Sequence, residues 1–130
     1  RKELNMPLMV TGGLRRLDAM EDALTSGSAD VVGIGRPMCV DTAAPLQLLA
    51  GEPELNRYEN SLSLLPPWLK FLERISLFRT LGAFATQYWY YQQLVLLGET
   101  GKADLELSVF SATKLQTKRS NALLAARRQA

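Results

Sequence analysis

Two short apolar runs that each end in glycine constrain the fold of this chain more than any other feature. The first covers residues 7–11, PLMVT, and is followed at once by Gly12 and Gly13. The second covers residues 31–34, VVGI, and is followed by Gly35. Runs of this length that are apolar on both faces and end in a turn are typical of buried strands in a parallel sheet. The sequence therefore predicts two such strands.

The segment between the two runs has the pattern of a short amphipathic helix. Its apolar positions Met20, Ala23 and Leu24 fall at helical spacing. Asp18 can cap its N-terminus, and Gly27 suits its C-terminal end. Roughly two dozen residues separate equivalent points of the two strands, which is the length of a βαβ crossover. We therefore expect parallel strands joined by a right-handed connection.

The character of the chain changes after Pro37. A further short helical pattern, which Asp41 can cap and Gly51 ends, closes the α/β section. We therefore place an α/β part at residues 1–51 and a helical extension at residues 52–130. The extension begins with a polar surface crossing, after which Pro66 and Pro67 mark a helix start. Its apolar positions are Leu69, Leu72, Ile75 and Phe78 in one helix, Phe84, Tyr88, Tyr91, Leu94 and Val95 in another, and Phe110, Leu115, Leu123 and Leu124 in a last one from about Ser108, with Gly98 and Gly101 at a turn.

The composition narrows the classes of function. Lysine and arginine exceed the acidic residues by only two among 130 residues, which gives no case for the positive field of a nucleic-acid-binding protein. The chain has no histidine, so no histidine-based acid, base, metal ligand or catalytic triad can be built from it alone. The single cysteine, Cys39, excludes an internal disulfide and a multi-thiolate zinc site and fits a reducing, cytoplasmic setting.

Residues 80–98 carry no charged side chain, and the segment is long enough to raise the question of a membrane span. Gln87, Gln92 and Gln93 are costly to place in hydrocarbon, and the tyrosines lie in the middle of the segment rather than at its ends. We therefore expect a buried or partner-packing helix and no contact with a membrane.

The two predicted strand ends carry the residues that suit a phosphate. Parallel neighbours bring their C-terminal turns to one edge of the sheet, and glycines let the backbone approach an anion with its N–H groups. Gly12 and Gly13 follow the first strand, and Gly35 with Arg36 follows the second. The guanidinium of Arg36 can bind two phosphate oxygens at once. The alternative, in which the glycines only make strand-to-helix turns and Arg36 is an ordinary surface residue, stays open on spacing alone.

The residues themselves, PLMVTGGLRRLDAMEDALTSGSADVVGIGRP, resemble the seventh and eighth βα units of the old yellow enzyme (NADH:flavin oxidoreductase) family. The resemblance is close over about the first fifty residues and looser in WYYQQLVLLGETGKADLELSVFSA, which is similar to the terminal helices of bacterial and fungal relatives. It implies an α/β fold, in which the chain forms the C-terminal βαβα portion of a TIM (β/α)8 barrel followed by a helical C-terminal extension. In this barrel the loops after strands seven and eight hold a phosphate at the C-terminal rim.

The resemblance also implies a cofactor and the residues that bind it. The cofactor is FMN, reduced by NADH or NADPH, and the reaction is hydride transfer to an electron-poor alkene or carbonyl-conjugated small-molecule substrate, as in ene-reductases. Gly12 and Gly13 match the glycine turn after strand seven, and Gly35 and Arg36 match the Gly-Arg pair after strand eight. These four residues are therefore the expected FMN-phosphate contacts.

The catalytic side chains of the family come from earlier strands, and none of their motifs is present in this chain. We therefore assign no catalytic residue and expect the 130 residues alone to be inactive. Arg1 is not a methionine and the first strand begins almost at once, so we expect the rest of the barrel upstream.

Two other interpretations come from different classes of protein. The chain can be a non-catalytic interaction module that forms a homo-oligomer through its aromatic C-terminal helices, because two strands of a barrel leave unpaired edges. A Rossmann-like domain fits less well, since its fingerprint needs a third glycine and an acidic residue where this chain has Gly35 and Arg36. Single residues also have simple interpretations: Cys39 as a small buried hydrophobe, Arg15 and Arg16 as solvated residues at a helix entry, and the aromatic residues 88–91 as a core or subunit-contact stripe.

Overall fold

The computed structural model describes residues 5–128 and divides the chain into two compact units, Arg1–Tyr58 and Glu59–Ala130. A short 3-10 helix, η2 (Tyr58–Asn60), lies at the division. Each unit has its own elements and its own packing. The boundary predicted after Gly51 separates the last two βα units from the helical extension, and it stays a prediction.

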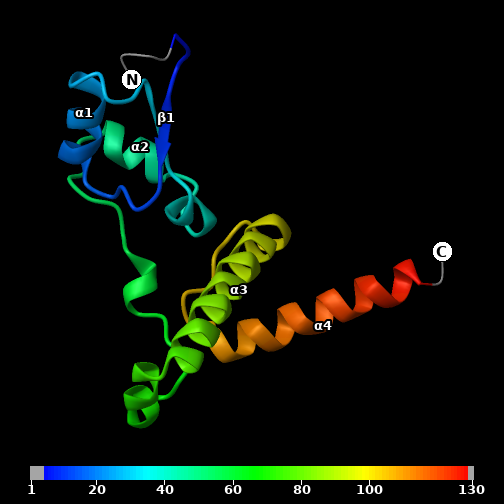
Figure 1. Ribbon diagram of the computed structural model, residues 1–130. Helices are drawn as coiled ribbons and strands as arrows, with labels where there is room; N and C mark the ends of the chain where they lie inside the picture. Colours follow the sequence, from blue (N-terminus) through cyan, green and yellow to red (C-terminus); the bar gives the residue numbers. More distant parts are fainter. Residues whose placement is uncertain (1–4, 129–130) are drawn as a thin grey trace. The chain divides into compact units, whose positions relative to one another are not determined.

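The first unit contains a two-stranded parallel sheet, with α1 and α2 on one side of β1 (Figure 1). Strand β1 (Met9–Thr11) pairs with β2 (Val31–Gly33) residue by residue, so that the two strands begin and end level with each other. The Asp30 carboxylate accepts a hydrogen bond of 2.8 Å from the backbone N–H of Leu8 at the start of the pairing. The predicted strand, helix and parallel strand are confirmed.

The strands are less buried than their apolar sequences predict. The side chains of Met9 and Val31 are 60% and 49% exposed. Burial on both faces requires a layer on each side of a sheet and paired neighbours at each edge. Among the described residues, β1 and β2 pair only with each other. The expectation of buried strands is therefore wrong for the first unit as it stands.

Helix α1 (Leu17–Thr25) connects the strands and packs on β2. Its N-cap is Arg16, so the predicted cap Asp18 is wrong by two positions and lies inside the first turn. The reason is that the backbone N–H of Leu17 donates to the carbonyl of Pro53 at 2.9 Å. Residues 53–55, the returning segment, thus supply an acceptor for a free N–H group at the helix start. The predicted end is confirmed, because Gly27 has φ +69° just beyond the helix.

The core of the first unit lies between α1, α2 (Ala44–Leu49) and the returning segment. Its buried side chains are Met20, Ala44, Leu48 and Leu55. Leu55 is 3% exposed although it belongs to the stretch predicted to cross the surface. Its N–H donates to the carbonyl of Arg15 at 2.9 Å, which continues the backbone pairing at the start of α1.

The second unit opens with the 3-10 helix η3 (Pro67–Arg74), followed by the long helix α3 (Ser76–Thr100). The sequence predicts one helix from Leu69 to Phe78, but Ile75 has φ −80° and ψ 126° and separates the two. Residues in η3 and α3 therefore do not share one continuous face. The predicted turn is half right: Gly101, with φ +72°, ends α3, whereas Gly98 lies within it.

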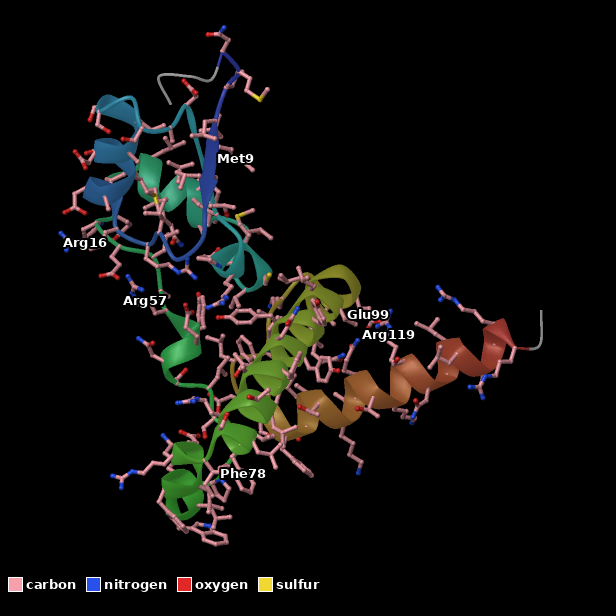
Figure 2. All side chains as sticks on the ribbon, in the orientation of Figure 1. Met9, Arg16, Arg57, Phe78, Glu99 and Arg119 are labelled. Atoms are coloured by element: carbon pink, nitrogen blue, oxygen red, sulfur yellow. The ribbon has the colours of Figure 1, made fainter. Side chains whose placement is uncertain are left out.

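Helix α4 (Val109–Arg127) begins at the predicted Ser108, whose Oγ accepts a hydrogen bond from the N–H of Ser111 at 3.1 Å. Its N-terminal part packs on α3. Farther along, Nη1 of Arg119 lies 4.0 Å from Oε1 of Glu99 (Figure 2). The connection between the helices is tied to α3 by Gln93, whose amide accepts from the N–H of Asp104 and donates to its carbonyl.

Helix α3 has a buried and an exposed side. Ala85, Trp89 and Gln93 are at most 3% exposed, and the indole N–H of Trp89 donates to the carbonyl of Leu107 at 2.7 Å. Leu77 and Phe84 are 62% and 57% exposed. Within residues 5–128, no helix combines the length and the apolar content that crossing a membrane requires.

Candidate functional site

The candidate site lies where the chain leaves the two parallel strands. Thr11, the last residue of β1, is the register partner of Gly33, the last residue of β2. The turns that follow, Gly12 and Gly13 after one strand and Gly35 with Arg36 after the other, therefore leave the sheet at the same edge. The structure thus brings the four predicted residues to one end of the sheet.

The first turn needs glycine for its backbone conformation. Gly12 has φ +116° and Gly13 has φ +73°, which side chains of L-amino acids rarely allow. A Cβ built on either residue meets no atom within 4 Å. Crowding by the protein is therefore not the reason for glycine here, and the turn borders open space that an anion can occupy.

The second turn is anchored by a buried residue. Gly35 precedes the 3-10 helix η1 (Arg36–Cys39), and its carbonyl accepts from the N–H of Met38 at 2.9 Å. Pro37 is fully buried, whereas Gly35 and Arg36 are exposed. The buried Pro37 thus anchors the backbone of this turn beside the exposed Gly35 and Arg36.

Another glycine, Gly33, allows the last residues of β1 and β2 to approach each other closely. A Cβ there would lie 3.0 Å from Cβ of Thr11, closer than side chains normally approach. The hydroxyl of Thr11 donates to the carbonyl of Gly33 at 3.3 Å. Sequence reasoning missed this pair, although a glycine inside an apolar strand is itself a sign of close backbone approach.

The two arginines after the first turn differ from each other. Arg15 is only 4% exposed, and its Nη1 donates to the carbonyl of Leu14 at 2.9 Å, so the prediction that it is solvated is wrong. It is buried because its backbone pairs with the returning segment at Leu55. Arg16 is solvated as predicted (Figure 2) and pairs with Asp18. This hydrogen bond lowers the pKa of the Asp18 carboxyl below its ordinary value.

Cys39 ends η1, close to the second turn. Partial burial raises the pKa of its thiol, and its Sγ lies 3.8 Å from the carbonyl oxygen of Gly35. A raised pKa reduces the thiolate fraction and hence the reactivity of the sulfur. The surroundings of Cys39 therefore favour a packing role over a redox role.

This arrangement is suited to binding rather than to proton transfer. Glycine N–H groups and one guanidinium offer donors and positive charge to a dianion. The chain has no histidine to act as acid or base near neutral pH. The residues present fit the phosphate group of a nucleotide-like cofactor.

Comparisons with known proteins identify two relatives. The chain is 32% identical over 101 residues to the NADH-dependent flavin oxidoreductase iccE of Talaromyces variabilis, a match that covers 75% of this chain and 23% of that protein. It is 42% identical over 40 residues to the NADH-dependent flavin oxidoreductase iliE of Neonectria sp. (strain DH2), covering 31% of this chain and 5% of that protein. The chain thus matches only a small part of each relative's length. No family model matches the chain, and no solved structure matches it.

Proposed function

We infer, from the similarity of its matched residues to two NADH-dependent flavin oxidoreductases, that this chain supplies the FMN-phosphate-binding part of a flavin-dependent NAD(P)H oxidoreductase. The observation that carries the proposal is the level pairing of β1 and β2, because it brings a diglycine turn and a Gly-Arg turn to one sheet edge. The names of both relatives favour NADH as the reductant.

The proposed binding mode uses backbone and side chain together. The N–H groups of Gly12, Gly13, Gly35 and Arg36 donate to phosphate oxygens, and the Arg36 guanidinium binds two of them. The guanidinium contributes positive charge and two parallel donors to the phosphate. FMN bound there supplies hydride transfer between the nicotinamide and an electron-poor alkene or carbonyl-conjugated substrate. The chain's own part is to hold and orient the cofactor.

The proposed architecture is the last two βα units of a TIM barrel, followed by a helical extension. In such a barrel every strand has a neighbour on each side. The exposed apolar side chains on β1 and β2, such as Met9 and Val31, fit strands that pair and pack with others. The 130 residues alone are then inactive, because the substrate-binding and proton-donating groups lie in other strands.

The test distinguishes binding of the phosphate group from binding of the rest of the flavin. FMN and riboflavin are titrated into the full gene product that carries this sequence and into its Arg36→Ala variant. Loss of a charge-assisted contact of about 1.5–3 kcal/mol weakens FMN binding roughly 10- to 150-fold and leaves riboflavin binding unchanged. Arg16→Ala, which removes an exposed arginine of the same unit, is the matched control. Equal effects of Arg36→Ala on both flavins contradict the assignment.

A second candidate function is self-association through α3. Six side chains recur at alternating spacings of four and three residues, which is the pattern of a coiled-coil seam: Leu77, Leu81, Phe84, Tyr88, Tyr91 and Val95. Leu81 and Tyr91 are 46% and 41% exposed, and residues 80–98 carry no charge that would repel an identical helix. The proposed occupant is therefore α3 of a second copy.

Sedimentation equilibrium tests this association. Phe84→Glu places a charge in the seam and is expected to shift a dimer to a monomer. Ala83→Glu, exposed and outside the seam, is expected to leave the dimer intact. A monomeric parent protein, or equal effects of the two variants, contradicts the proposal.

A further inference from the structure

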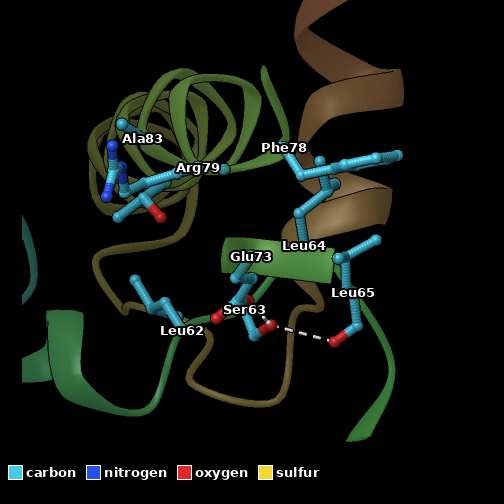
Figure 3. Close-up of a pocket in the computed structure, with 10 residues that line it drawn as sticks. Leu62, Ser63, Leu64, Leu65, Glu73, Phe78, Arg79 and Ala83 are labelled. Carbon is cyan, nitrogen blue, oxygen red and sulfur yellow. Dashed lines mark hydrogen bonds between the residues drawn. The ribbon is translucent and has the colours of Figure 1, made fainter. Parts of the chain in front are cut away.

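A pocket of about 370 Å³ lies within the second unit, between the segment before η3, η3 itself and the first half of α3 (Figure 3). Its volume falls in the range of small-molecule sites. Leu65 and Phe78 form part of an apolar wall, and Ser63, Glu73 and Arg79 supply the polar groups. An apolar pocket with a few polar groups is the usual composition of a ligand site.

Gly82 keeps one wall of this pocket open. It lies inside α3, where glycine is a poorer helix former than alanine. A Cβ built on it meets no atom within 4 Å, so no neighbour in the described chain excludes a side chain. Its backbone is also not in the left-handed region. The glycine therefore serves neither a turn nor a close contact, and its position borders free volume in the pocket.

The two charged side chains that line the pocket, Glu73 and Arg79, differ in their contacts. The hydroxyl of Ser63 lies 2.9 Å from Oε1 of Glu73 and 2.9 Å from the carbonyl oxygen of Leu65, and its single hydrogen is shared between these two acceptors. Arg79 extends from α3, and its guanidinium points away from the Ser63 and Glu73 side chains in Figure 3. Among the residues that the structure describes, no carboxylate forms an ion pair with Arg79. Glu73 keeps its negative charge, so the positive group with which an anionic ligand can pair is Arg79, whose guanidinium points away from Glu73.

We propose that this pocket binds a small ligand with an apolar body and one anionic group, such as an aromatic or aliphatic carboxylate or sulfonate. The apolar body occupies the space beside Gly82 and Phe78, and the anionic group pairs with Arg79. The site lies wholly within Glu59–Ala130, whereas the proposed flavin-phosphate contacts lie within Arg1–Tyr58. The two proposed sites are therefore built from different residues.

The test uses a substitution that fills the pocket without weakening α3. 1-Anilinonaphthalene-8-sulfonate, an aromatic sulfonate, is titrated into the full gene product, and its fluorescence reports binding. Gly82→Leu places a side chain in the free volume and replaces glycine by a better helix former, so the variant is expected to keep or raise Tm while its affinity falls at least ~10-fold. Gly98→Leu is the matched control, because Gly98 also lies in α3 with no atom within 4 Å of an added Cβ but does not line the pocket.

A second variant tests the charge. Arg79→Gln is expected to weaken binding of the sulfonate and to leave binding of the uncharged probe N-phenyl-1-naphthylamine unchanged. Equal affinities for Gly82→Leu and Gly98→Leu overturn the site, and so does the absence of any saturable binding. Equal effects of Arg79→Gln on both probes overturn the ligand class. Flavin affinity, measured on the same variants, is expected to stay at the parental value, so failure here is distinguishable from failure of the flavin assignment.

Discussion

Gly12 and Gly13 are the residues on which the candidate site depends most directly. Both have positive φ, and a Cβ on either would meet nothing within 4 Å. Their requirement for glycine is conformational, so a substitution changes the path of the backbone and with it the direction of the N–H groups. This distinguishes them from Gly33, where the requirement comes from the proximity of Thr11.

Gly13→Ala is therefore expected to destabilise the protein by about 1 kcal/mol, because alanine in the left-handed region costs about 1–2 kcal/mol and the stiffer unfolded chain offsets part of it. Urea unfolding measures the change. The control Gly98→Ala lies in a helix and is expected to be neutral or stabilising. Equal free energies of unfolding for Gly13→Ala and the parent contradict the assigned backbone conformation.

Single residues also show where prediction from sequence stops. Gly27 and Ser108 were predictable as helix boundaries, since their roles depend on local conformation and local hydrogen bonds. Arg15 and Asp18 were not, because the returning segment around Leu55 pairs with the start of α1 from far along the chain. No local pattern near Arg15 encodes that long-range pairing.

At the scale of elements, hydrophobic periodicity predicts the strand, helix and strand and the order of the later helices. It does not predict the interruption between η3 and α3, because Leu72, Ile75 and Phe78 keep helical spacing across it. It also overestimates the burial of β1 and β2, since an apolar run reports what a strand can bury and not which neighbours are present. The parallel pairing itself, which positions the candidate site, was predictable from the length of the connection.

Gln93 is the residue that fixes the connection between α3 and α4. Its side chain is fully buried, and its amide makes hydrogen bonds of 2.7 and 2.8 Å with the carbonyl and N–H of Asp104. Gln93→Leu keeps a similar volume but leaves both backbone groups without a partner. We expect a loss of about 1–3 kcal/mol in the free energy of unfolding.

Denaturant unfolding followed by tryptophan fluorescence measures this loss, since Trp89 lies one turn away on the same helix. Gln87→Leu is the control, because Gln87 is an exposed glutamine of α3 whose side chain, within residues 5–128, hydrogen-bonds only with Tyr91 of its own helix. A similar, small change for both variants contradicts the role assigned to Gln93.

At the scale of the whole molecule, the chain holds two units with different proposed tasks. The first brings two glycine turns and Arg36 to one edge of a parallel sheet, and the second is a helical unit with a pocket and an exposed seam. The resemblance to the NADH:flavin oxidoreductase family is clearest over residues 7–37, because the turn residues and the strand pattern occur together there. The second unit carries no comparable motif. Its pocket depends on the packing of η3 against α3, which the sequence did not predict.

The two turns are proposed to bind one phosphate. A crystal structure of the full gene product with FMN tests this proposal most directly through the position of the phosphorus atom and its oxygens. We expect phosphate oxygens about 2.7–3.2 Å from backbone nitrogens of both turns and from the Arg36 guanidinium. A phosphate bound at another edge of the sheet, or contacted by only one of the two turns, contradicts it.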